Sequence, residues 1–157
     1  MKKILVSTCL YGGEPVRYDG KSKALEAPVF LKWKEEGRLI PICPEVFGGL
    51  PVPRVDAQRQ GDRVVTRDGT DVTAEYSAGA CEAVRLAAEG GVVCALLKEK
   101  SPSCGSTYIY DGRFDGTLTE GEGLTAELLR KAGIEVFSEN QLDKISRLIE
   151  DLQETDI

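Results

Sequence analysis

The stretch VVCALLKEKSPSCG, residues 92–105, decides the fold class of this chain. Its first half is apolar on both faces, a pattern typical of a central strand in a parallel sheet. Its second half is a polar loop with a proline and a glycine, and this loop contains Cys104. A structural thiol normally packs within an apolar element, as we expect for Cys94, whereas Cys104 lies where a strand end presents side chains to a ligand. The stretch therefore predicts a parallel sheet with a site at its edge.

Apolar runs and helical patterns alternate on both sides of this stretch. Further strands are predicted near residues 3–9, 38–43 and 134–138, and helices over residues 24–36, 73–89, 125–132 and 141–152. Asp68-Gly69 and the segment STYIYDGRFDG, residues 106–116, predict two small hairpins. This order predicts an α/β fold, a Rossmann-like three-layer domain over residues 1–157 with a mainly parallel sheet and small hairpin insertions.

The composition restricts the classes of function. Of the 157 residues, 41% are hydrophobic and 29% are charged, and the net charge is −6 with both signs interspersed. A nucleic-acid-binding surface needs clustered basic residues, so we expect no nucleic-acid partner. The N-terminal residues are typical of a first core strand and not of a signal sequence, and no apolar stretch reaches membrane-spanning length. We therefore expect a cytoplasmic protein without a membrane partner.

The chain has five cysteines and no histidine. An odd number of cysteines in a reducing compartment argues against a disulfide framework and for metal, cluster or thiol chemistry. The lack of histidine excludes histidine-containing zinc sites and Cys-His nucleophile pairs. Acid–base chemistry must then come from carboxylates, lysine, tyrosine, cysteine or water.

Three of the cysteines, Cys9, Cys43 and Cys104, each follow the end of a predicted strand. Because the carboxyl ends of parallel strands meet at one edge of a sheet, we expect these thiols to converge. Cys81 falls on a stripe of small residues at helical spacing and Cys94 lies within a strand, so both are predicted to be core residues. Three thiols indicate a soft metal, and this chemistry alone leaves both zinc and a 4Fe-4S cluster open.

Five motifs together resemble the thiouracil desulfidase family in its short single-domain form, formerly a bacterial domain of unknown function. They are STCLYG, VRYDG, CPEVFGGLPVPR, DVT and LKEKSPSCGS, in this order along most of the chain. The resemblance implies an enzyme that converts thiolated pyrimidines to the oxo form and hydrogen sulfide without redox chemistry. It also implies a 4Fe-4S cluster that is bound by Cys9, Cys43 and Cys104 and keeps one iron open for the substrate sulfur.

The resemblance assigns roles to two further polar residues. Glu45, two residues after Cys43, corresponds to an acidic residue of the family, and Ser101 corresponds to the serine that opens the SPSCG motif. Glu45 would transfer a proton to or from the reacting groups, and Ser101 would hydrogen-bond the substrate or the water. The alternatives are a solvated carboxylate for Glu45 and a turn-forming hydroxyl for Ser101.

Other polar residues near the same edge are candidates for binding the base. Arginines can bind a base edge or a phosphate, and a tyrosine can stack on a pyrimidine ring or cap the sheet. The helix that opens with GEGLTA, residues 121–126, adds backbone amides that could bind an anion or the substrate. The candidate substrate-binding side chains are Arg17, Tyr18, Asp19, Arg54 and Ser103.

The main alternative to an enzyme is an iron–sulfur or sulfide carrier that uses the same cysteines without turnover. A carrier needs no proton-transfer group, so Glu45 favours the enzyme. The expected partners are a small thiolated base or nucleoside and iron–sulfur assembly proteins. The sequence leaves open whether the substrate is a free base, a nucleoside or a nucleotide.

Overall fold

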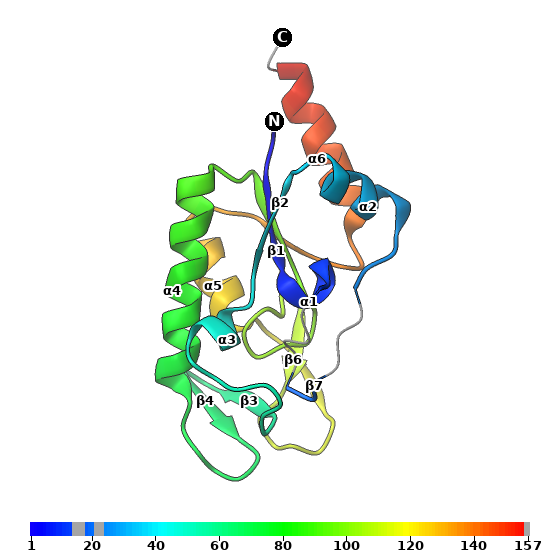
Figure 1. Ribbon diagram of the computed structural model, residues 1–157. Coiled ribbons are helices and arrows are strands. Elements are labelled where there is room, and N and C mark those ends of the chain that lie inside the picture. The colour runs from blue at the N-terminus through cyan, green and yellow to red at the C-terminus, as the bar shows by residue number, and fades with distance from the viewer. Residues whose placement is uncertain (14–17, 21–23, 156–157) are drawn as a thin grey trace.

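The computed structural model, which describes residues 1–13, 18–20 and 24–155, is built around a four-stranded parallel sheet (Figure 1). The strand order is β2-β1-β5-β8, and Leu5 of β1 lies between Ile40 of β2 and Ala95 of β5. From β1 the chain adds β2 on one side and later β5 on the other. The loops after β1 and β5 therefore leave the sheet in opposite directions, which makes room for a ligand between them. The strands are β1 (Ile4–Ser7), β2 (Leu39–Ile42), β5 (Cys94–Leu97) and β8 (Val136–Ser138).

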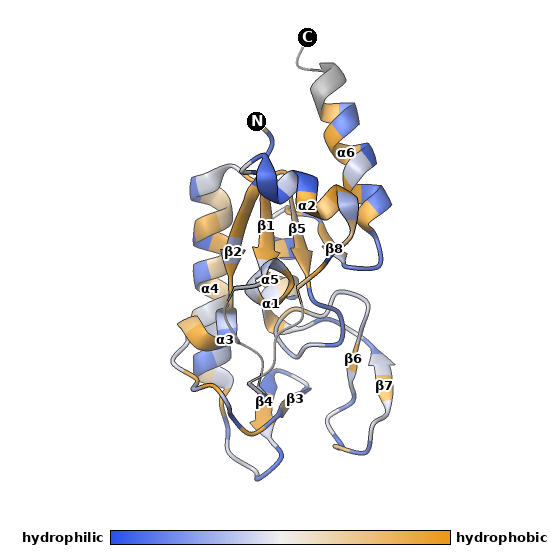
Figure 2. Ribbon diagram, turned by 45° about the vertical axis from the view of Figure 1, so that its right-hand side comes forward, coloured by the Kyte–Doolittle hydropathy of each residue, from blue (hydrophilic) through white to orange (hydrophobic). Residues whose placement is uncertain are grey.

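The described residues form six helices besides the sheet, and four of them cover its two faces. Phe30 of α2 and Ile145 of α6 pack on the face that carries Ile4, while Ala83 of α4 and Leu129 of α5 pack on the opposite face. Figure 2 shows the apolar strands between these two layers. The predicted three-layer α/β fold is confirmed. The helices are α1 (Thr8–Tyr11), α2 (Pro28–Glu35), α3 (Pro44–Phe47), α4 (Thr73–Gly90), α5 (Leu124–Lys131) and α6 (Leu142–Thr155).

Two hairpins extend from the carboxyl end of the sheet, away from the termini (Figure 1). One pairs β3 (Ala57–Gln60) with β4 (Arg63–Thr66), and the other pairs β6 (Tyr108–Tyr110) with β7 (Leu118–Glu120). A tight turn does occur at residues 68–69, as predicted, but the β3–β4 hairpin turns earlier, at residues 61–62. None of the helices in the described residues is long and apolar enough to cross a membrane.

The buried face of α4 is not the predicted one. Cys81 is exposed, and the buried stripe instead contains Tyr76, Gly79 and Ala83. A Cβ atom on Gly79 would lie 1.9 Å from the carbonyl oxygen of Pro44, so only glycine allows α4 to approach α3 this closely. Small residues recur at helical spacing on both faces of α4, and the sequence pattern therefore could not separate them. The prediction of a buried Cys94 is confirmed.

Candidate active site

A cavity of about 470 Å³ lies at the carboxyl ends of β1, β2 and β5, and Cys9, Cys43 and Cys104 all line it. Cys43 joins β2 to α3, and Cys104 lies in the loop after β5. Cys9 does not end a strand directly, because β1 stops at Ser7 and Cys9 lies in the short helix α1. The thiols, separated by 34 and 61 residues in the sequence, therefore meet at one cavity.

The surroundings of Cys43 and Cys104 oppose the ionisation of their thiols. Burial raises the pKa of the Cys104 thiol above its usual range; the nearby Cys9, Glu45 and Cys43 add to the rise, and a hydrogen bond with Ser7 opposes it. Burial also raises the pKa of Cys43. A bound cation would offset the mutual repulsion of these thiolates.

The three cysteines at the cavity are potential ligands of a metal centre. Within the part of the chain that the structure describes, no three histidine, cysteine or carboxylate side chains lie close enough to hold a single metal ion. Around a multi-iron cluster each cysteine binds a different iron, so the ligands stand further apart than around one zinc ion. The three thiols at one cavity match the number of protein ligands of a 4Fe-4S cluster that keeps one iron open.

The loop that carries Cys104 is shaped by Ser101. The Ser101 hydroxyl oxygen accepts hydrogen bonds from the backbone amides of Ser103, at 3.1 Å, and Cys104, at 3.0 Å. The turn-forming role that was the alternative for Ser101 is therefore present. Since these bonds use the oxygen as acceptor, the hydroxyl hydrogen remains available for donation into the cavity, which Ser101 also lines.

Glu99 anchors the continuation of this loop. Its carboxylate accepts hydrogen bonds from the backbone amides of Ser106 and Thr107, both at 3.0 Å, and of Tyr108, at 3.1 Å. Burial tends to raise the pKa of Glu99, but the backbone amides outweigh burial and hold the pKa below its usual value. The charged carboxylate thereby fixes the segment that follows Cys104.

The first amides of α5 also hold the Cys104 loop. The amides of Gly123, Leu124 and Thr125 donate to the carbonyl oxygens of residues 105, 102 and 103, at 2.8, 3.0 and 2.9 Å. The prediction that the amides of residues 121–126 bind an anion or the substrate is therefore wrong for these three. The helix end is occupied by backbone of the protein itself.

Glu45 is a clamped carboxylate and not a solvated one. One of its oxygens accepts a hydrogen bond from the Tyr76 hydroxyl, and the other forms an ion pair with Arg54. Tyr76 lies on α4 and is 2% exposed, and burial followed by the charge of Glu45 raises its pKa well above the usual range. Sequence reasoning missed Tyr76, whose large polar side chain among small residues of α4 was the available signal.

The predicted substrate-binding residues occupy different positions. Tyr18 lines the cavity and is 45% exposed. Arg54 and Asp19 do not line it, and Arg54 contacts Glu45 instead. Ser103 is fully buried, and its hydroxyl lies 2.8 Å from that of Thr125, which directs it away from the cavity. Arg17 lies outside the described residues.

The two hairpins form the outer wall of the cavity. Gln58 and Arg67 of the β3–β4 region and Tyr110 of β6 line it. Arg67 forms two hydrogen bonds with Asp56, at 3.0 and 2.9 Å, and so has a fixed partner within the wall. None of these residues was predicted, because they come from a region whose strands are short and polar.

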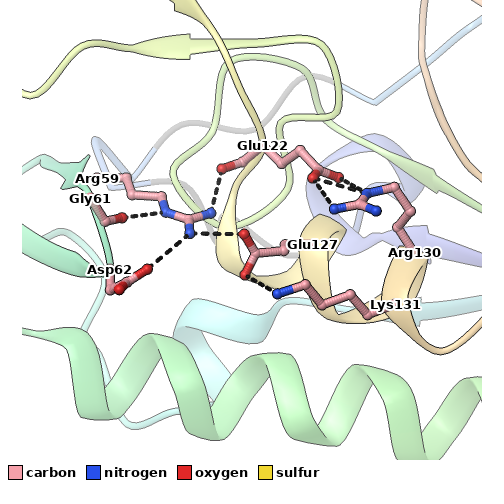
Figure 3. Close-up of polar contacts among 7 residues, drawn as sticks. All are labelled: Arg59, Gly61, Asp62, Glu122, Glu127, Arg130 and Lys131. Carbon is pink, nitrogen blue, oxygen red and sulfur yellow. Dashed lines mark hydrogen bonds and ion pairs between the residues drawn. The ribbon is translucent and has the colours of Figure 1, made fainter.

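Arg59 attaches this wall to the body of the molecule (Figure 3). Its guanidinium donates to the carbonyl oxygen of Glu122 at 2.7 Å and to the carboxylate of Glu127 on α5 at 3.0 Å. Figure 3 also shows Arg130 of α5 paired with the Glu122 carboxylate. The Arg59 side chain is only 10% exposed, so this contact excludes most solvent.

The sequence and the fold of this chain were compared with those of known proteins. A family model described as 2-thiouracil desulfurase matches residues 4–141. The chain belongs to the 2-thiouracil desulfurase family. The family resemblance drawn from the motifs is thereby confirmed.

Two similar proteins illustrate how far the similarity extends. The uncharacterized protein YbbK of Bacillus subtilis (strain 168) is 41% identical over 152 residues, which are 90% of this chain and 99% of YbbK. A solved structure of TudS, a 4Fe-4S-dependent thiouracil desulfidase, is 52% identical with a TM-score of 0.93. The match covers 96% of this chain and 99% of that one. The desulfurase family fold therefore extends over nearly the whole molecule.

Proposed function

We propose that this protein is a desulfidase that replaces the sulfur of thiouracil-type pyrimidines with oxygen, with a 4Fe-4S cluster bound by Cys9, Cys43 and Cys104. The observation that carries the proposal is that three separated thiols and a clamped carboxylate, Glu45, line the same cavity. In the overall reaction a thiocarbonyl and water give a carbonyl and hydrogen sulfide. Atoms balance and no electrons are transferred, so no reductant is required.

The cavity suits both the cofactor and a small substrate. Its volume of about 470 Å³ is in the range of small-molecule sites. When bound, a cluster with three protein ligands supplies one open iron, a Lewis acid that attracts a soft sulfur and polarises the carbon attached to it. The same cysteines would receive the cluster from iron–sulfur assembly proteins, which we propose as partners.

Glu45 accepts and donates the proton that this reaction transfers. Tyr76 and Arg54 each occupy one lone pair of a carboxylate oxygen, and each oxygen keeps a further acceptor site. Glu45 can therefore take a proton from the attacking water while its position stays fixed, and then pass the proton to the departing sulfur. Ser101 donates its hydroxyl hydrogen to the substrate or the water, because loop amides occupy its oxygen.

The test is turnover of 2-thiouracil or 4-thiouracil by protein reconstituted anaerobically with iron and sulfide. We expect the thiouracil absorbance to disappear in step with the sulfide released, over many equivalents per cluster. A carrier would take up the cluster but release no more than about one sulfide per protein. Colourless protein that retains zinc and no iron would contradict the cluster and the activity together.

A further inference from the structure

Gln58 is an uncharged polar side chain that is almost fully enclosed in the cavity wall. It lies on β3 and is 6% exposed, yet it is among the residues that line the cavity. Burial of an amide is costly unless its polar atoms find partners. The partners of its two ends therefore indicate what the residue does.

The oxygen end of Gln58 has partners in the other hairpin. Its Oε1 accepts hydrogen bonds from the backbone amides of Gly112, at 3.0 Å, and Phe114, at 3.2 Å. A flipped amide would place Nε2 against these two N–H donors. The two backbone amides thus decide which end of the side chain is oxygen and hold the β6–β7 hairpin against β3.

The nitrogen end of Gln58 is different. Within the described residues Nε2 has no hydrogen-bond partner, whereas both hydrogen bonds of the side chain use Oε1. Among those residues the only fully buried side-chain polar atom without a partner is Oε2 of Glu75, so Nε2 of Gln58 keeps access to the cavity. A fixed N–H donor in a cavity wall that no protein acceptor occupies is available to an acceptor of a bound ligand.

We infer that Gln58 determines substrate specificity by donating a hydrogen bond from Nε2 to the oxygen that remains on the thiolated pyrimidine ring. In 2-thiouracil and in 4-thiouracil this oxo group is related to the thiocarbonyl in the same way, with N3 between them. A single N–H donor can therefore hydrogen-bond the oxo group of either isomer. The inference rests on the proposed function, which it deepens.

The same donor would reject cytosine-type bases. In 2-thiocytosine an amino group replaces the oxo group, so two N–H donors would meet and both would lose their partners. A site built to hydrogen-bond one substituent rejects analogues strongly because its buried polar group is left unpaired. The wild-type protein should thus prefer 2-thiouracil over 2-thiocytosine by at least about 10-fold in kcat/KM.

The experiment replaces Gln58 by glutamate, which keeps an oxygen for Gly112 and Phe114 and turns the donor into an acceptor. In reconstituted protein, Gln58→Glu should lower kcat/KM for 2-thiouracil by about 10-fold to 100-fold and shift the ratio toward 2-thiocytosine by at least about 10-fold. Calorimetry gives a second readout, since the affinity of the holoprotein for uracil should fall while that for cytosine rises.

Gln60→Glu is the matched control. Gln60 lies on the same strand, does not line the cavity, and donates from Nε2 to the carbonyl oxygen of Gly112 at 2.8 Å. This variant loosens the hairpin but should leave the preference between the two bases unchanged. If Gln58→Glu does not fold, Gln58→Met takes its place and should reduce the preference for 2-thiouracil over pyrimidine-2-thione, which lacks the oxo group.

Unchanged base preference in folded Gln58→Glu, or wild-type protein that accepts 2-thiocytosine as well as 2-thiouracil, would overturn the inference. Gln58 would then only connect the hairpins, and the desulfidase proposal would stand. Wild-type protein that binds uracil in preference to cytosine but releases no sulfide would instead contradict the proposed function and leave the role of Gln58 supported.

Discussion

The two walls of the cavity differ in how they are held. The wall at the sheet edge carries the cysteines, and backbone–backbone hydrogen bonds from the first amides of α5 to the carbonyl oxygens of residues 102, 103 and 105 fix its Cys104 loop. The hairpin wall is held by side chains, chiefly Arg59, Arg67 and Gln58. Backbone contacts at strand ends fix atoms tightly, whereas side-chain contacts between short strands leave room for variation. The difference suggests that the sheet edge performs the reaction and the hairpins select the substrate.

Loss of a thiol from the sheet-edge wall should have the largest effect. Replacing Cys9, Cys43 or Cys104 by serine should abolish cluster assembly, because each thiol would bind a separate iron. Iron and sulfide content and visible absorption after anaerobic reconstitution measure this. Cys81→Ala and Cys94→Ala are the controls and should retain the cluster. A cluster that persists in Cys104→Ser would refute the assignment of ligands.

Glu45→Gln tests whether the sheet-edge wall also provides the proton transfer. We expect the cluster to remain and kcat for thiouracil to fall by about 100-fold or more, since an amide cannot accept the proton. Glu89→Gln, on the exposed side of α4, should leave kcat unchanged. Full turnover in Glu45→Gln would remove this residue from the reaction.

Arg59→Met tests the hairpin wall. Removing a guanidinium that is largely buried between the hairpin and α5 leaves the Glu127 carboxylate with only its longer ion pair to Lys131, and should lower the free energy of unfolding by about 2–3 kcal/mol. We expect a higher KM for thiouracil with an unchanged cluster content. Arg130→Met removes a more exposed ion pair of the same group and should cost less than about 1 kcal/mol. If urea unfolding showed the same loss of stability in Arg59→Met and Arg130→Met, the special role of the buried Arg59 contact would be contradicted.

Glu99 should give the smallest effect, visible mainly as a dependence on pH. Its pKa is lower in the folded protein than in the unfolded chain, so the charged form stabilises the fold above about pH 4.3. This contribution is lost as the pH falls through the folded-state pKa. Glu99→Gln should be about 1 kcal/mol less stable at pH 7 and close to wild type in acid, as measured by urea unfolding without added iron. The control Glu150→Gln should change the free energy of unfolding neither at pH 7 nor in acid.

The parts of this protein that could be predicted are those with strong local patterns. The apolar runs indicated the strands of the parallel sheet, and the positions of Cys9, Cys43 and Cys104 after these runs indicated where the cavity lies. One wrong prediction concerns which face of a helix is buried. Cys81 faces solvent although its stripe was predicted to be buried, because α4 packs on α3 through Gly79.

Contacts between distant segments decided the remaining features. Arg54, predicted to bind substrate, pairs with Glu45, and Tyr76 completes that clamp from α4. Gln58 gained its role only when the second hairpin supplied two backbone amides to its oxygen. No local pattern in the sequence predicts such pairings, because each depends on which side chains the packing brings within hydrogen-bond distance.

The sequence by itself determined the α/β architecture, the family and the three candidate ligands Cys9, Cys43 and Cys104, because periodicity, turn residues and motifs are local properties of the chain. Only the tertiary structure decided that these thiols share a cavity, that Glu45 is held by Tyr76 and Arg54, and that the Gln58 amide nitrogen has no partner among the described residues. The physical reason is that hydrogen bonds and close contacts act over a few ångströms in space, irrespective of the 34 and 61 residues that separate the thiols along the chain.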